Sequence, residues 1–223
     1  MSPLLLSLKT SIIATFIVMI FGTLTARLIT RRQFKGKILL ESLILLPMVL
    51  PPTVVGFGLL YLFGKNGLIG QVLMELFDVQ IIFTWYAAVL AATVVAFPLM
   101  YQSASASFRR YDANLENAAY TLGAGRFKVF WTISIPLAWP GLLSGIVLSF
   151  ARALGEFGAT LMIAGYIPGK TDTLPLAIYF SVEAGNTEQA LVWVIIIASF
   201  GFIAIYWLNL WNRKNAMDFP KNR

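Results

Sequence analysis

Residues 5–28 read LLSLKTSIIATFIVMIFGTLTARL, a largely apolar run with one lysine and one arginine. A helix crosses a bilayer with about 20 residues, so this run is long enough to span a membrane. Apolar stretches of similar length follow at residues 38–63, 81–101, 137–164 and 190–211. Only 12% of the chain is charged, against about 25% in soluble domains. The sequence therefore predicts one all-α transmembrane domain, a polytopic membrane helix bundle with about five spans surrounded by lipid.

The segments between the predicted spans alternate in charge. Residues 27–37, residues 102–136 and the tail after residue 211 hold five, four and four of the 17 cations, whereas residues 64–80 and 165–189 hold one each. Basic residues in short loops stay in the cytoplasm. We therefore expect the first three segments and the C-terminus inside and the N-terminus outside; a missed or misplaced span is the alternative. The early residues lack the basic leader and cleavage site of a secretory signal, so we expect a retained first span.

The composition also limits the chemistry that the chain can perform. It contains no cysteine and no histidine, which excludes disulfides and thiolate metal sites and removes the usual general base. Gly169-Lys170-Thr171 looks like the end of a phosphate-binding loop, but this chain has Ala164 where such a loop needs its first glycine. We therefore expect no catalytic residue, no metal site and no bound cofactor, and no nucleic-acid partner.

The second predicted span contains residues that interrupt a helix. Pro51 and Pro52 each remove a backbone donor, and Thr53 and Gly56 follow within one turn. Carbonyl groups freed at membrane depth need protein or a water-filled cavity around them. These four residues are therefore candidates for lining a pathway or its gate, and a kinked packing helix is the alternative.

The fourth predicted span contains Arg152 and Glu156, four residues apart. A charge in the bilayer core costs about 2.5–3.5 kcal/mol even on lenient scales. At this spacing the two side chains can pair along a helix. We expect either a local ion pair buried against neighbouring helices or a gate that contacts an anion.

The long connection at residues 102–136 has a regular pattern of small residues. Ala118 and Ala119 follow Asn117, Gly123 comes after three intervening residues, and nine further residues lead to Ile133-Ser134-Ile135-Pro136. Small side chains leave one face of a short helix unobstructed, and a glycine commonly ends such a helix. The pattern predicts a helix that docks in a groove of another protein, or one that packs only on its own subunit.

This spacing resembles the signature of importer permeases of the ATP-binding cassette class, which reads Glu-Ala-Ala, three residues, Gly, nine residues, Ile-x-Leu-Pro. The resemblance implies that the segment couples the membrane subunit to a cytoplasmic ATPase. Two positions depart from it, since Asn117 replaces the family glutamate and Ile135 replaces the leucine. Glu116 is adjacent but one position out of register, and Asn117 keeps hydrogen-bonding capacity without the charge.

Residues 50–57, 62–70, 149–160 and 167–179 look like the molybdate branch of that class, and they are similar to sulfate permeases as well. The resemblance implies a homodimer in the cell membrane that moves an oxyanion inward, with molybdate, tungstate and sulfate as alternatives. An extracytoplasmic binding protein would deliver the substrate, and a partner ATPase would use ATP and Mg²⁺.

Two other classes of function are alternatives to an importer permease. A membrane enzyme would need polar catalytic groups clustered on one face, and the predicted spans offer few charged residues besides Arg152 and Glu156. A passive channel or scaffold would carry no segment for docking an ATPase. Copurification with an ATPase separates these classes.

Overall fold

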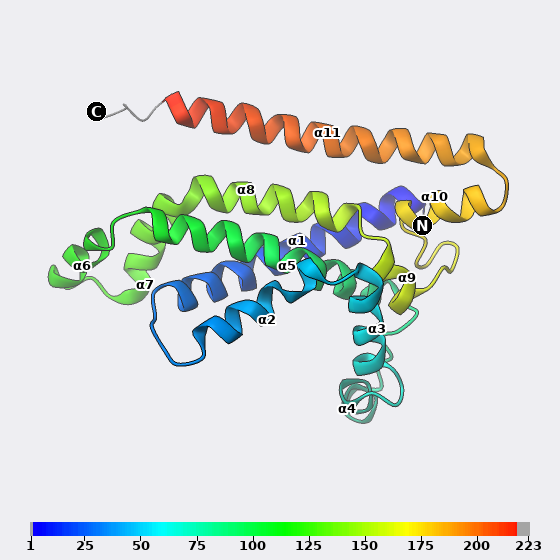
Figure 1. Cartoon of the computed structure of the whole chain (residues 1–223), viewed down its shortest axis with the longest axis horizontal. Coiled ribbons are helices and arrows are strands. Elements are labelled where there is room, and N and C mark those ends of the chain that lie inside the picture. Colours follow the sequence, from blue (N-terminus) through cyan, green and yellow to red (C-terminus); the bar gives the residue numbers. More distant parts are fainter. Residues whose placement is uncertain (1, 218–223) are drawn as a thin grey trace.

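The computed structural model describes residues 2–217, which form helices and no strands (Figure 1). Part of the cation-rich tail, including Lys221 and Arg223, lies outside the described residues. In chain order the helices are α1 (Pro3–Thr30), α2 (Lys37–Val49), α3 (Pro52–Phe63), α4 (Leu68–Phe77), α5 (Trp85–Arg110), α6 (Asn114–Thr121), α7 (Arg126–Val129), the π-helical turn η1 (Phe130–Ser134), α8 (Ile135–Leu154), α9 (Gly158–Ala164), α10 (Leu174–Glu183) and α11 (Thr187–Met217).

Three long helices form the centre of the bundle. α5 packs against both α1 and α8, and α1 also contacts α8. Their contact surface is rich in alanine, which lets helix backbones approach closely in a membrane protein. At Gly22 of α1, an added Cβ would lie 2.9 Å from the side chain of Met100 on α5. The bundle is therefore held by close packing of small residues around a few large buried ones, such as Phe108.

The second predicted span is broken into two helices. α2 and α3 meet at an angle of 114°. Leu50 and Pro51 are both extended, with ψ of 143° and 136°, because a residue that precedes proline is disfavoured in the helical conformation. Helices of 13 and 12 residues are about 20 Å and 18 Å long, too short to cross a hydrocarbon core of about 30 Å alone. The prolines thus break the helix as expected.

The fourth predicted span differs most from the observed helix. The helix begins at Arg126, continues through η1 and α8, and ends at Leu154, with a break before α9. The π turn ends two residues before Pro136, and Ile135 donates its N–H to the carbonyl of Phe130, five residues earlier. Proline clashes with the carbonyl four residues before it, so a wider turn lets the helix continue through this position.

The connection at residues 102–136 is consequently shorter than predicted. α5 continues to Arg110 and the next helix begins at Arg126, which leaves α6 and its flanking turns between them. Hydropathy marks where a helix leaves lipid rather than where it ends, so both helices extend beyond their apolar parts. The sequence pattern also gave no indication of α10 within residues 165–189.

The connections group at two ends of the molecule. The turn between α1 and α2, the segment with α6 and α7, and the end of α11 lie at one end, while α9, α10 and the start of α1 lie at the other (Figure 1). This is the grouping that the cation distribution predicts, and the assignment of the first end to the cytoplasm stays a prediction. α11 runs along the outside of the bundle. Only 6% of its most apolar 18 residues are buried, against 61% of those of α5.

Candidate functional site

The short helix predicted in the long connection is α6. It ends in a Schellman motif, in which Gly123 donates its N–H to Tyr120 and Ala124 donates to Ala119, each at 3.0 Å. Gly123 has a φ of +83°, a conformation that disfavours any residue with a Cβ. The glycine therefore ends the helix for the reason expected from the sequence.

One face of α6 is open to its surroundings. Asn117 and Ala118 are exposed, Ala119 is half-buried, and Leu122 at the end of the helix is 88% exposed. No other heavy atom lies within 4 Å of a Cβ added at Gly123, apart from its chain neighbours. An exposed surface of small and apolar residues suits docking in a groove, and the docking itself stays a prediction.

Glu116, on the opposite side of α6, is the centre of a buried ionic network. Its carboxylate lies 2.6 Å from Nη2 of Arg27 and 3.3 Å from Nη2 of Arg31, both on α1. The hydroxyl of Ser134, in the π turn, donates to it at 2.8 Å, and the Tyr111 hydroxyl donates as well. Glu116 thus ties α6 to the end of α1 and to the start of α8.

The network has a fixed charge state near neutral pH. Burial alone would raise the pKa of Glu116, but the hydrogen bonds from Arg27, Tyr111 and Ser134 outweigh it and hold that pKa below its usual value. Burial, together with the hydrogen bond to Glu116, raises the pKa of the Tyr111 hydroxyl. Glu116 is therefore a carboxylate and Tyr111 a neutral donor, so the contacts persist across the physiological range.

The sequence pattern placed Glu116 out of register and did not reveal this role. A signal was available: Arg27 and Arg31 are four residues apart, so they share one face of α1, where a common acidic partner is favourable. A second pair at the same end was also missed, in which Arg109 of α5 lies 3.0 Å from Glu41 of α2. Because Arg109 is more than half exposed, this second pair contributes little stability.

The residues predicted from the two broken spans come together in space. α3 packs against α9, each directly after its break. A Cβ added at Gly56 of α3 would lie 2.7 Å from Cα of Ala159. A Cβ added at Gly158 would lie 3.1 Å from Pro52 and 3.2 Å from the backbone nitrogen of Thr53. The contact therefore depends on glycine on both sides, while Pro51 and Thr53 remain exposed beside it.

Arg152 and Glu156 form an ion pair across the second break. Nη1 of Arg152 lies 2.8 Å from Oε2 of Glu156. That oxygen lies off the N–H direction and accepts no hydrogen bond within the described part of the chain, whereas Oε1 accepts from the Ala159 N–H at 2.8 Å. Glu156 therefore caps α9 while Arg152 occupies the last turn of α8. The negative charge of Glu156 is stabilised by the partial positive charge at the start of α9. The positive charge of Arg152 is stabilised by the partial negative charge at the end of α8.

The remaining residues predicted from the signature follow α6 along the chain. Ile133 is in the π turn and Pro136 is in the first turn of α8. Together with α6 they form one continuous segment at the end of the bundle that also holds the turn between α1 and α2 (Figure 1). The candidate site thus has two parts, the α6 segment at one end and the paired helix breaks toward the other.

A bundle of several helices long and apolar enough to cross a bilayer is the architecture of a multi-pass membrane protein. The family described as binding-protein-dependent transport system inner membrane component matches residues 9–216 of this chain. The chain therefore belongs to that family.

Several curated relatives cover most of the chain. The putative molybdenum transport system permease protein YvgM of Bacillus subtilis is 51% identical over 93% of this chain and 91% of that protein. The molybdenum transport system permease protein ModB of Escherichia coli K12 is 46% identical over 87% of this chain and 85% of that protein. The sulfate transport system permease protein CysW of Synechococcus elongatus is 35% identical over 90% of this chain and 70% of that protein.

Solved structures share the fold at low sequence identity. A chain of a bacterial alginate transporter, solved in complex with a periplasmic protein, superposes with a TM-score of 0.72 at 16% identity and covers 95% of this chain and 77% of that one. A chain of the inward-facing methionine transporter MetNI superposes with a TM-score of 0.70 at 15% identity, over 94% of this chain and 92% of that one. At such identities the likeness concerns the fold alone.

Proposed function

We propose that the chain is the membrane-spanning permease subunit of an ATP-driven importer that moves molybdate into the cell. The observation that carries the proposal is the 51% identity, across 93% of the chain, to a permease named for molybdenum transport. The sulfate permease CysW is more distant, at 35%. Sulfate and tungstate are the second candidates, because both are tetrahedral dianions like molybdate.

The energy for transport comes from a separate ATPase subunit, which binds ATP and Mg²⁺ and docks on α6. The exposed face of Asn117 and Ala118 supports this assignment, as does the burial of Glu116 behind it. The chain itself supplies no catalytic residue and binds no cofactor. An extracytoplasmic binding protein delivers the anion at the opposite end of the bundle.

Transport takes place between two copies of the chain. In one copy, Pro51 and Thr53 are exposed beside the α3–α9 contact, and the Arg152 side chain is about one-third exposed. A second copy that faces these residues would enclose a path. Glu156 compensates Arg152, so the anion would meet polar groups without a strong positive trap. Conduction requires binding that is weak enough for release.

Alternating access needs two conformations of the transporter, and nucleotide binding must shift the equilibrium between them. Glu116 fixes α6 to the ends of α1 and α8 by contacts of 2.6 Å to Arg27 and 2.8 Å to Ser134. A displacement of α6 by the ATPase is therefore passed to both helices, and the breaks at α3 and α9 provide the points at which the bundle can bend.

The test is reconstitution of the chain in proteoliposomes with its ATPase and binding protein. Labelled molybdate should accumulate only when ATP is present, and a tenfold excess of unlabelled sulfate should compete poorly. Uptake that needs no ATPase would identify a passive channel and refute the proposal. Sulfate uptake faster than molybdate uptake, with the matching binding proteins, would assign the chain to the sulfate class.

A further inference from the structure

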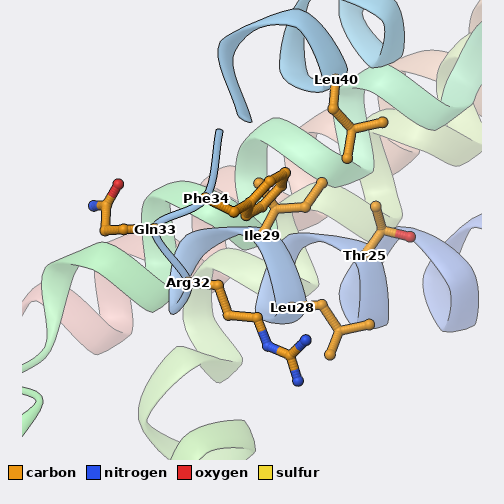
Figure 2. Close-up of a pocket in the computed structure, with 7 residues that line it drawn as sticks. All are labelled: Thr25, Leu28, Ile29, Arg32, Gln33, Phe34 and Leu40. Carbon is orange, nitrogen blue, oxygen red and sulfur yellow. The ribbon is translucent and has the colours of Figure 1, made fainter. Parts of the chain in front are cut away.

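A pocket lies between the end of α1 and the start of α2, with a volume of about 570 Å³. Four of its seven lining residues are apolar and three are polar. The lining residues are Thr25, Leu28, Ile29, Arg32, Gln33, Phe34 and Leu40. Figure 2 shows Phe34 beside Ile29, and the Arg32 side chain directed toward Leu28. Pockets of roughly 300–1,000 Å³ hold small organic ligands.

The turn beside this pocket has a positive charge that the described residues leave unpaired. Arg32, Lys35 and Lys37 fall within six residues, and none has an acidic partner among residues 2–217. The neighbouring cations Arg27 and Arg31 differ, because Glu116 pairs with both of them. The pocket edge therefore carries a local charge that a ligand can complement.

The pocket lies at the depth of lipid headgroups. α1 has 28 residues and is about 42 Å long, which exceeds a hydrocarbon core of about 30 Å, so its last turn reaches the polar interface. Leu28 is 55% exposed, and Ile38 at the start of α2 is 81% exposed. Exposed apolar surface at this depth marks contact with a membrane or with another protein.

We propose that this pocket binds an anionic phospholipid. The acyl chain lies against Leu28, Ile29, Phe34 and Leu40, and the phosphate is held by Arg32, with Lys35 and Lys37 adding to the field. Basic pockets between membrane helices bind anionic headgroups, and the apolar flank continues into the surface that faces lipid. A soluble partner would complement the charge but would leave that flank exposed to water.

The proposal is tested with the purified full-length chain, delipidated in detergent and titrated with phosphatidylglycerol or phosphatidylcholine. Native mass spectrometry measures the lipid bound per subunit. Phosphatidylglycerol should bind several-fold more tightly than phosphatidylcholine. One basic residue near an anionic surface is worth about fivefold in affinity, so Arg32→Gln/Lys35→Gln should weaken binding about 25-fold.

Two controls keep the result specific to the pocket. Arg126→Gln/Lys128→Gln removes the same charge from exposed positions on α7 and should leave lipid binding unchanged. Thr25→Trp fills the pocket without changing charge and should reduce binding at least fivefold. Equal loss in the α7 variant, full binding in Thr25→Trp, or equal affinity for both lipids would overturn the proposal. Hydrogen exchange of residues 31–37 provides a further check. If the ATPase or a second copy slows this exchange equally with and without lipid, the proposal is overturned and the pocket binds a protein.

Discussion

Gly56→Ala tests the contact between the two broken helices, and Gly58→Ala on the same helix is its matched control. A Cβ at position 56 would lie 2.7 Å from Cα of Ala159 and 2.8 Å from Cβ of Met162. Carbon atoms in contact are normally about 3.5–4.0 Å apart. The nearest atom belongs to backbone and cannot rotate away, so α3 and α9 must separate by about 1 Å. At position 58 nothing lies within 4 Å of the added atom.

The size of the effect follows from two opposing terms. Overpacking a close contact costs about 1–3 kcal/mol. Replacing glycine by alanine inside a helix contributes about 0.8–1.0 kcal/mol of stability. Gly58→Ala experiences only the second term and should stabilise the chain. Gly56→Ala experiences both, so the two variants should differ by about 1–3 kcal/mol in the free energy of unfolding.

The two variants are compared by titrating each from mild detergent into SDS and following helix content by circular dichroism. The midpoint for Gly56→Ala should lie below that of the wild type, and the midpoint for Gly58→Ala at or above it. Molybdate uptake in proteoliposomes should fall in the first variant alone, because the breaks beside Pro52 are displaced. If the free energies of unfolding of the two variants differ by less than about 0.5 kcal/mol, which is the usual error of additivity, α3 and α9 are not in close contact.

Three further perturbations test the remaining contacts. Glu116→Gln removes charge-assisted contacts worth about 1.5–3 kcal/mol and should speed hydrogen exchange of residues 111–125 about 10- to 100-fold. Folding lowers the pKa of Glu116. The stability advantage of the wild type over Glu116→Gln should therefore be constant above the usual glutamate pKa of about 4.3, and should disappear only as the pH falls through the lower pKa of the folded state. Gly123→Ala forces a Cβ into a φ of +83° and should destabilise α6 by about 1–2 kcal/mol, whereas Gly125→Ala, at −70°, should be neutral in the same exchange measurement. Arg152→Leu or Glu156→Leu alone should lower folded abundance, and the double variant should recover part of it; additive losses would contradict pairing.

Features that depend on the local chemistry of lipid and proline were predictable from the sequence. The apolar runs identify α1, α5 and α11, because a helix in hydrocarbon must be apolar along its length. The break between α2 and α3 follows from Pro51 and Pro52, whose missing donors no neighbour can supply. The αL glycine at position 123 likewise follows from a local backbone requirement.

Features that depend on contacts between distant segments were not predictable. Arg27 and Glu116 are 89 residues apart, and no local pattern indicates that they meet. The start of the helix of the fourth predicted span at Arg126 was also missed, because two cations, Arg126 and Lys128, stand in its first turn and its proline is accommodated by a π turn. The packing of Gly56 on Ala159 requires both breaks to lie at the same depth, which only the three-dimensional arrangement reveals.

α8 connects the two parts of the candidate site. It begins beside Ser134, which donates to Glu116, and ends two residues after Arg152, directly before the second break. Its 20 residues make a rod about 30 Å long, which is close to the thickness of the hydrocarbon core. The network around Glu116 ties α6 to Ser134 at the start of α8, and the second break follows the other end of α8. A push on α6 should therefore move α8 as a rigid body and change the geometry at Gly158, where α9 meets α3, rather than distort the helix between them.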